Sequence, residues 1–75
     1  MEAGTESRAV RIVLNGADTT LAGVGSVAEL VEGLGLPVER VAVEVDGAIV
    51  RKADYLSTPL RDGARIEVVS FVGGG

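Results

Sequence analysis

The chain ends in three consecutive glycines, Gly73, Gly74 and Gly75, which directly follow a strand-like run. A glycine tail cannot hold a fold together, but it presents one unhindered reactive group, the terminal carboxylate of Gly75. Glycine makes up about 7% of average composition, so a Gly-Gly end arises by chance in about one chain in 200. The plain alternative is a frayed or non-native end, because disorder collects at termini. The remainder of the chain has to decide between these two interpretations.

The tail has the reach and the chemistry of a group that is handed to a partner enzyme. Residues 72–75 can extend about 13 Å from a sheet, and glycine has no side chain to block a narrow channel. An enzyme that admits only such a tail would select the terminal carboxylate over every side-chain carboxylate. Adenylation by ATP would convert it to an acyl-phosphate anhydride, and a sulfur donor would then give a C-terminal thiocarboxylate.

Other reactive side chains are scarce. The chain contains no Cys and no His, which excludes disulfides, thiolate metal sites, iron–sulfur clusters and catalysis by Cys or His. Ser26 has no His or Lys poised to activate it, so we interpret it as a helix N-cap. Asp46 and Asp62 each precede a glycine, where Asp stabilises turns. We therefore predict a protein that is not an enzyme and that has no metal site and no cofactor.

Composition indicates one small globular domain. Hydrophobic residues make up 47% of the chain, and 7 basic against 11 acidic residues give a formal net charge of −4. The basic residues are scattered, so nucleic-acid binding is not expected, whereas an acidic surface suits either a basic protein partner or solubility alone. No apolar stretch approaches the ~20 residues of a membrane span, and no signal peptide is evident. We expect a cytoplasmic protein that is monomeric when free.

The first half of the chain predicts a hairpin followed by a helix. Strands at 9–14 and 18–22 should pair across Asn15-Gly16, a strong turn signal. Ser26 should open a helix of about 9 residues, with Glu29 at the capping-box position. Either Gly33 or Gly35 could supply the left-handed residue that ends it. The apolar stripe of this helix consists of Val27, Leu30, Val31 and Leu34.

The second half predicts strands at 41–45, 48–50 and 65–71. A helix this short is unstable alone, so its stripe must lie across one face of the sheet. The order predicts an α+β fold of the β-grasp type, with a mixed four- to five-stranded sheet and one main helix packed on one face. We expect this domain to span 9–71, between a flexible N-terminal segment (1–8) and a flexible glycine tail (72–75). The predicted core is Val10, Ile12, Leu14, Leu21, Val27, Leu30, Val31, Leu34, Val43, Ile49, Leu56, Leu60, Ile66 and Val68.

The last strand places an apolar pair beside the tail. If Ile66 and Val68 face the helix, then Val69 and Phe71 face the open side of the sheet. An exposed apolar pair is costly unless something covers it, either a partner or another segment of the chain. We predict that Val69, Phe71 and Val72 form a partner-binding patch next to the reactive end.

Several segments together resemble the ThiS family of thiamine-biosynthesis sulfur carriers, over roughly residues 9–75. They are Asn15-Gly16, the run 43–50, the run 59–63 and the run 67–75. The ending Phe-Val-Gly-Gly-Gly is the most specific part. The acidic extension at 1–7 departs from the family, whose members usually begin at the first strand.

The resemblance implies a ubiquitin-like sulfur carrier. A ubiquitin-activating-like adenylyltransferase would use ATP to adenylate Gly75, a sulfur-donor protein would supply sulfur, and thiazole synthase would accept it. Gly73 and Gly74 would thread the partner active site. Relatives serve molybdopterin, cysteine or tRNA thiolation, but Phe71-Val72 stands where the molybdopterin synthase small subunit usually has a proline-containing run. A ubiquitin-like protein modifier and an interaction module with an inert tail are the alternatives from other classes.

Overall fold

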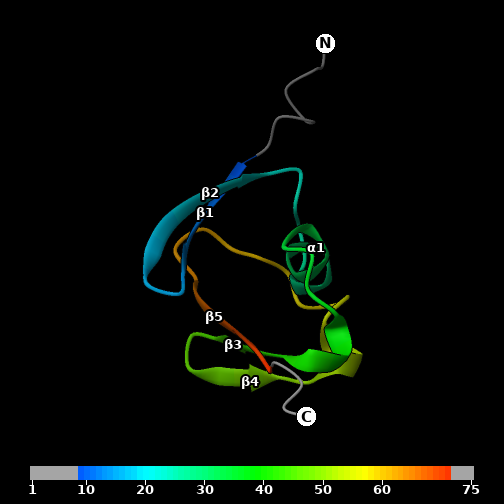
Figure 1. Cartoon of the computed structure of the whole chain (residues 1–75). Coiled ribbons are helices and arrows are strands. Elements are labelled where there is room, and N and C mark those ends of the chain that lie inside the picture. Colours follow the sequence, from blue (N-terminus) through cyan, green and yellow to red (C-terminus); the bar gives the residue numbers. More distant parts are fainter. Residues whose placement is uncertain (1–8, 72–75) are drawn as a thin grey trace.

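The computed structural model describes residues 9–71, so the predicted segments 1–8 and 72–75 lie outside the described residues. The described chain forms five strands and one α-helix (Figure 1). In chain order the elements are β1 (Ala9–Leu14), β2 (Ala17–Ala22), α1 (Val27–Gly33), the 3-10 turn η2 (Val38–Arg40), β3 (Val41–Val45), β4 (Ala48–Val50), the 3-10 turn η3 (Lys52–Asp54) and β5 (Arg65–Ser70). The predicted order of strands and helix is confirmed.

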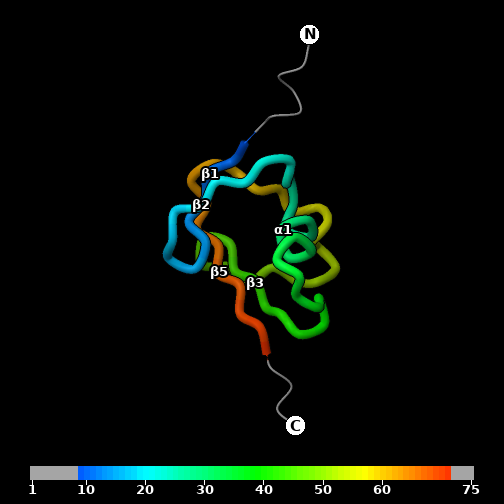
Figure 2. The backbone as a smooth tube through the Cα atoms, turned by 45° about the horizontal axis from the view of Figure 1, so that its top comes forward, coloured from blue at the N-terminus to red at the C-terminus, as the bar shows by residue number. Residues whose placement is uncertain are grey.

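The five strands form one mixed sheet in the order β2-β1-β5-β3-β4. The neighbours β1 and β5 are parallel, and the other pairs are antiparallel. Helix α1 lies on one side of this sheet in both views (Figures 1 and 2). The start of β1 and the end of β5 lie at opposite ends of the domain (Figure 2). This is the predicted β-grasp arrangement, with the fifth strand present.

Two-residue turns fix the register of both hairpins. Asn15 and Gly16 have φ values of 50° and 84°, and Asp46 and Gly47 have 51° and 87°. Positive φ at both central residues is the type I′ geometry, whose twist matches that of the flanking strands. The Asn-Gly and Asp-Gly dipeptides therefore set which residues face each other across β1–β2 and β3–β4.

Helix α1 begins with a side-chain cap and ends at a glycine. The Ser26 hydroxyl accepts a hydrogen bond from the Glu29 backbone N–H at 3.2 Å, as predicted. The Glu29 carboxylate in turn accepts the Gly25 N–H at 2.6 Å. Gly35, rather than Gly33, takes the left-handed conformation, with φ 73°. Helix α1 has 7 residues, fewer than predicted, because Leu34 already serves as the C-cap.

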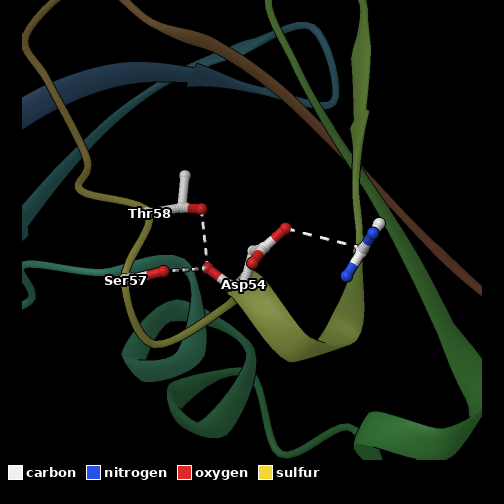
Figure 3. A network of polar contacts seen from close by, with 4 residues as sticks. Asp54, Ser57 and Thr58 are labelled. Atoms are coloured by element: carbon white, nitrogen blue, oxygen red, sulfur yellow. Dashed lines mark hydrogen bonds and ion pairs between the residues drawn. The ribbon is translucent and has the colours of Figure 1, made fainter.

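The turn after η3 is fastened to the N-terminus of α1. The Val27 N–H donates to the Thr58 carbonyl at 2.9 Å, and the Ala28 N–H donates to the Tyr55 carbonyl at 3.0 Å. Figure 3 shows the Thr58 hydroxyl pointing at the Asp54 backbone carbonyl, to which it donates at 2.6 Å. Two free N–H groups of the first helical turn are therefore satisfied by a loop from the second half of the chain, and Ser26 satisfies that of Glu29.

The core lies between α1 and the sheet. It includes three residues that the sequence analysis left out, Val41, Tyr55 and Ala64, and burial raises the pKa of the Tyr55 phenol above its usual value. The buried hydrophobic residues are Ile12, Val27, Leu30, Val31, Val41, Val43, Tyr55, Ala64, Ile66 and Val68.

Three predicted core residues are wrong. Leu34, Ile49 and Leu56 are exposed instead. Leu34 follows the last helical residue, so the apolar stripe stops before it. Ile49 pairs with Glu44 and so lies on the face of the sheet opposite α1. Leu56 is the neighbour of Tyr55, and in this turn it is Tyr55 that is buried.

Candidate functional site

The last strand has one buried face and one exposed face. Ile66 and Val68 are buried beneath α1, whereas the side chains of Val69 and Phe71 are 52% and 56% exposed. The strand alternation predicted this division correctly. The remaining predicted site residues, Val72 and Gly73 to Gly75, lie outside the described residues. The partner-binding role of this region stays a prediction.

A third apolar side chain joins this surface from β4. In the β3–β5 ladder Val69 pairs with Ala42 and Glu67 pairs with Glu44, and in the β3–β4 ladder Glu44 pairs with Ile49. Directly paired residues of a sheet share a face, so Ile49, which is 72% exposed, lies on the face of Val69. We call the surface formed by Ala42, Ile49, Val69 and Phe71 the open-face patch.

Ile49 was predicted to lie in the core, and its place in the open-face patch was not predicted. The signal was available in the Asp46-Gly47 turn. A two-residue hairpin loop makes Val45 the partner of Ala48, and counting back from that pair places Ile49 opposite Glu44. An exposed glutamate therefore marks the face on which Ile49 lies.

Beyond β5 the backbone stays paired up to the start of the predicted tail. The Phe71 N–H donates to the Arg40 carbonyl at 2.6 Å, one residue past the end of the strand. This bond continues the β3–β5 ladder, in which Val41 pairs with Ser70. The chain is thus held against β3 as far as Phe71, and the glycines follow after one further residue.

On its other side β5 is held by the side chain of a turn residue. Strand β1 pairs with β5 only as far as Leu14, which lies beside Ile66. The Asn15 carboxamide continues the pairing: its Oδ1 accepts the Val68 N–H at 2.8 Å and its Nδ2 donates to the Val68 carbonyl at 3.2 Å. A carboxamide can donate and accept like a peptide group, so Asn15 takes the place of one further strand residue.

Two aspartates that were interpreted as local turn residues also reach distant backbone. The Asp46 carboxylate accepts the Arg65 N–H at 2.9 Å, and its own N–H donates to the Arg65 carbonyl at 2.7 Å. The Asp62 carboxylate accepts the Arg11 N–H at 2.8 Å. Asp46 thus secures the start of β5 and Asn15 secures its last part, so both halves of the strand that leads to the tail are fixed.

The Asn15 contact can be tested by separating its two hydrogen bonds. Asn15→Asp keeps the acceptor and tolerates the left-handed turn, as Asp46 does in this chain, but it cannot donate to Val68. Asn15→Gly keeps the turn and loses both bonds. At roughly 0.5–1.5 kcal/mol per hydrogen bond, we expect the Gly variant to lose about 1–3 kcal/mol of unfolding free energy and the Asp variant less.

Hydrogen exchange provides the specific measurement for Asn15. The Val68 amide should remain protected in Asn15→Asp, which still accepts its proton, and should exchange faster in Asn15→Gly. If the Val68 amide is equally protected in both variants, the carboxamide contact does not hold the end of β5.

The described residues show neither a metal cluster nor a membrane-spanning helix. Between residues 9 and 71, no three His, Cys, Asp or Glu side chains are grouped so that they could hold a metal ion. In the same part of the chain, no helix is long and apolar enough to cross a membrane.

Comparison with known proteins relates most of the chain to one family. A model of the ThiS family matches residues 7–75. The crystal structure of the thiamine biosynthesis protein (ThiS) from Geobacter metallireducens is similar, with a TM-score of 0.72 and 32% identity over 88% of this chain and 100% of that one. A solution structure of a thiamine biosynthesis protein from the same organism has the same TM-score and identity and is covered to 88%.

Two curated relatives are much longer than this chain. A protein named thiazole synthase from Paramagnetospirillum magneticum is 35% identical over 66 residues, and one of the same name from Magnetococcus marinus is 42% identical over 72 residues. Each match covers 88% of this chain and 20% of the relative. The chain therefore spans about a fifth of the length of these curated relatives.

Proposed function

The chain belongs to the ThiS family, and we propose that it carries sulfur for the thiazole ring of thiamine as a thiocarboxylate on Gly75. In this role it is a substrate of its partners and not itself an enzyme. It would work in the cytoplasm, where ATP is available for adenylation. The observation that carries the proposal is a rigid strand end, bearing exposed Val69 and Phe71, that leads into a glycine terminus.

The proposed chemistry takes place at a single carbon atom. A carboxylate oxygen of Gly75 attacks the α-phosphorus of ATP, pyrophosphate leaves, and an acyl adenylate results. A sulfur nucleophile then attacks the acyl carbon, the carbon–oxygen bond to AMP breaks, and a thiocarboxylate remains. With sulfide as the nucleophile no reductant is needed. A ubiquitin-activating-like adenylyltransferase would catalyse the first step, and a sulfur-donor protein would supply the sulfur in the cell.

The body of the protein would act as the recognition element for its own terminus. Without side chains, Gly73, Gly74 and Gly75 can enter a channel that excludes bulkier segments. Val69 and Phe71 would dock beside the channel entrance, since exposed apolar side chains gain free energy when a partner covers them. The hydrogen bonds of Asn15 to Val68 and of Arg40 to Phe71 keep these docking groups at a fixed distance from the start of the tail.

Thiazole synthase is the sulfur acceptor that we propose. The two curated relatives of that name contain a segment similar to this chain within a polypeptide about five times as long. A carrier-like segment on the same chain as the rest of a thiazole synthase would raise the effective concentration of one for the other. That arrangement supports thiazole synthesis over the molybdopterin, cysteine and tRNA pathways.

Labelling of the terminus tests the proposed function. The chain contains no cysteine, so a thiol-directed alkylating reagent has no thiol to react with until a thiocarboxylate forms. After incubation with ATP, the cognate adenylyltransferase and sulfide, the intact mass should rise by the replacement of one oxygen with sulfur, and alkylation should then label the C-terminal peptide.

The same reaction distinguishes a sulfur carrier from an interaction module with an inert tail and from a ubiquitin-like protein modifier. An unchanged mass with an active adenylyltransferase would contradict the carrier function and favour an inert tail. High-mass conjugates to lysines in cells would indicate a protein modifier. Omitting ATP provides the control, because sulfide alone does not convert a carboxylate.

A further inference from the structure

We propose that Glu44 and Glu67 together receive an arginine side chain of thiazole synthase when the open-face patch docks. The inference rests on the proposed function and names the polar part of the same interface. It is drawn from the pairing of these two glutamates across β3 and β5.

The two glutamates oppose each other directly. In the antiparallel β3–β5 ladder Glu44 and Glu67 are Cα partners, so their side chains project from the same face of the sheet. Both are exposed. Like charges placed directly opposite each other are destabilising in a sheet. A chain selected only for solubility could carry the same two charges at separate positions without this cost.

No cation of the domain itself neutralises the pair. The ion pair present between residues 9 and 71 joins Arg51 and Asp54, with 3.7 Å between Nε and Oδ2. No Lys or Arg side chain in that range is within salt-bridge distance of Glu44 or Glu67. Within residues 9–71 the two carboxylates therefore have no cationic side chain as a partner.

The pair lies within apolar surroundings. Ile49 flanks Glu44 on β4, and Val69 follows Glu67 on the same face of β5. When a partner covers Ile49 and Val69, water leaves the neighbourhood of the carboxylates. Charge-assisted hydrogen bonds made there are stronger and more specific than bonds at a solvated rim.

The occupant that fits is a guanidinium group. Arginine presents five N–H donors in a planar fork, which can bond two carboxylates at once. A calcium ion would need six to eight oxygen ligands, more than two carboxylates provide. A second copy of this chain would bring a further set of negative charges against the pair, because the net charge of the chain is −4. A protein partner with an arginine beside an apolar pocket would bind both the two carboxylates and the apolar side chains of the open-face patch.

Binding of the full-length chain to the thiazole synthase of the same organism tests the inference. The double variant Glu44→Gln and Glu67→Gln should raise the Kd roughly tenfold or more, the scale of losing hydrogen bonds to charged groups. Its Kd should also depend less on salt concentration than that of the wild type. Each of the two glutamine substitutions is also made alone and compared with Glu32→Gln, an equal change of one charge on α1, which covers the other face of the sheet. Glu32→Gln should leave the Kd and its salt dependence close to those of the wild type.

Thermal unfolding distinguishes partner binding from a purely structural role. If the two glutamates stabilised the fold, their replacement would lower the Tm. Relief of the like-charge pair should raise the Tm of the double variant while its binding weakens. Unchanged affinity and salt dependence in the double variant, or equal weakening by Glu32→Gln, would overturn the inference. A wild-type chain that forms the thiocarboxylate but binds no thiazole synthase would also overturn it, while the carrier function would stand.

Discussion

Removal of Gly75 should abolish thiocarboxylate formation and leave the unfolding transition unchanged. The shortened chain still ends in a glycine carboxylate, that of Gly74, so the chemistry of the group is preserved and only its position changes. One residue spans about 3.3–3.6 Å of extended chain. A displacement of about 1 Å at a reacting centre can cost on the order of 10²-fold in rate. The Gly74 carboxylate would stop about 3.3–3.6 Å short of the position that the Gly75 carboxylate reaches, so we expect no measurable reaction. The strand ladder reaches Phe71 without the last residue, which is why stability should not change.

The measurement is the alkylation assay, run alongside thermal unfolding of the same samples. A chain that lacks residues 2–7 is the matched control, since it loses more residues but retains the tail and every described contact. It should be labelled like the full chain. Labelling of the Gly75-deleted chain at the full rate would show that the terminal carboxylate does not need its distance from β5 and would remove the basis of the proposed function.

Ile66→Ala should remove a large share of the unfolding free energy of the domain. Ile66 is fully buried in β5, paired with Leu14 on β1 and Val45 on β3, so no neighbouring strand can shift to fill the cavity without breaking a ladder. Truncation of a buried Ile to Ala costs about 2–5 kcal/mol. At about 0.05–0.15 kcal/mol per residue, a domain of this size has about 4–11 kcal/mol in total. The substitution therefore removes about a fifth of the stability at the least.

Urea unfolding followed by circular dichroism measures this loss. The matched control is Val69→Ala on the same strand, whose side chain is 52% exposed and whose truncation should change the unfolding free energy by about 0.5 kcal/mol or less. Equal destabilisation by the two substitutions would mean that β5 does not have one buried and one exposed face. That result would also remove the geometric argument for the open-face patch.

The two predictions assign different tasks to the two faces of one strand. Ile66 and Val68 hold the sheet to α1, whereas Glu67, Val69 and Phe71 face outward next to the terminus. Because successive side chains of a strand point to opposite faces, a single substitution can alter one face of β5 and leave the other unchanged. Core variants of β5 should lower stability, and outward-facing variants should alter partner binding with little effect on folding.

Local signals in the sequence were sufficient for the elements and for most of the core. Ser26 caps α1 as predicted, and Asn15-Gly16 and Asp46-Gly47 form the expected tight turns. The Glu29 carboxylate accepts the N–H of Gly25 rather than that of the N-cap Ser26. These features depend on interactions within four residues, which a short stretch of sequence contains completely. The wrong core residues are Leu34, just past the helix, Ile49 in the short strand β4, and Leu56 in the turn after η3. In such places the periodicity is too short to distinguish one face from the other.

The sequence by itself determined the glycine ending, the order of the elements and the outward position of Val69 and Phe71. Only the tertiary structure decided that Glu44 faces Glu67, and that the Asn15 carboxamide closes on Val68, 53 residues away. The reason is that strand register and strand order are set by non-local packing and hydrogen bonding, whereas caps, turns and alternation are set by neighbours along the chain.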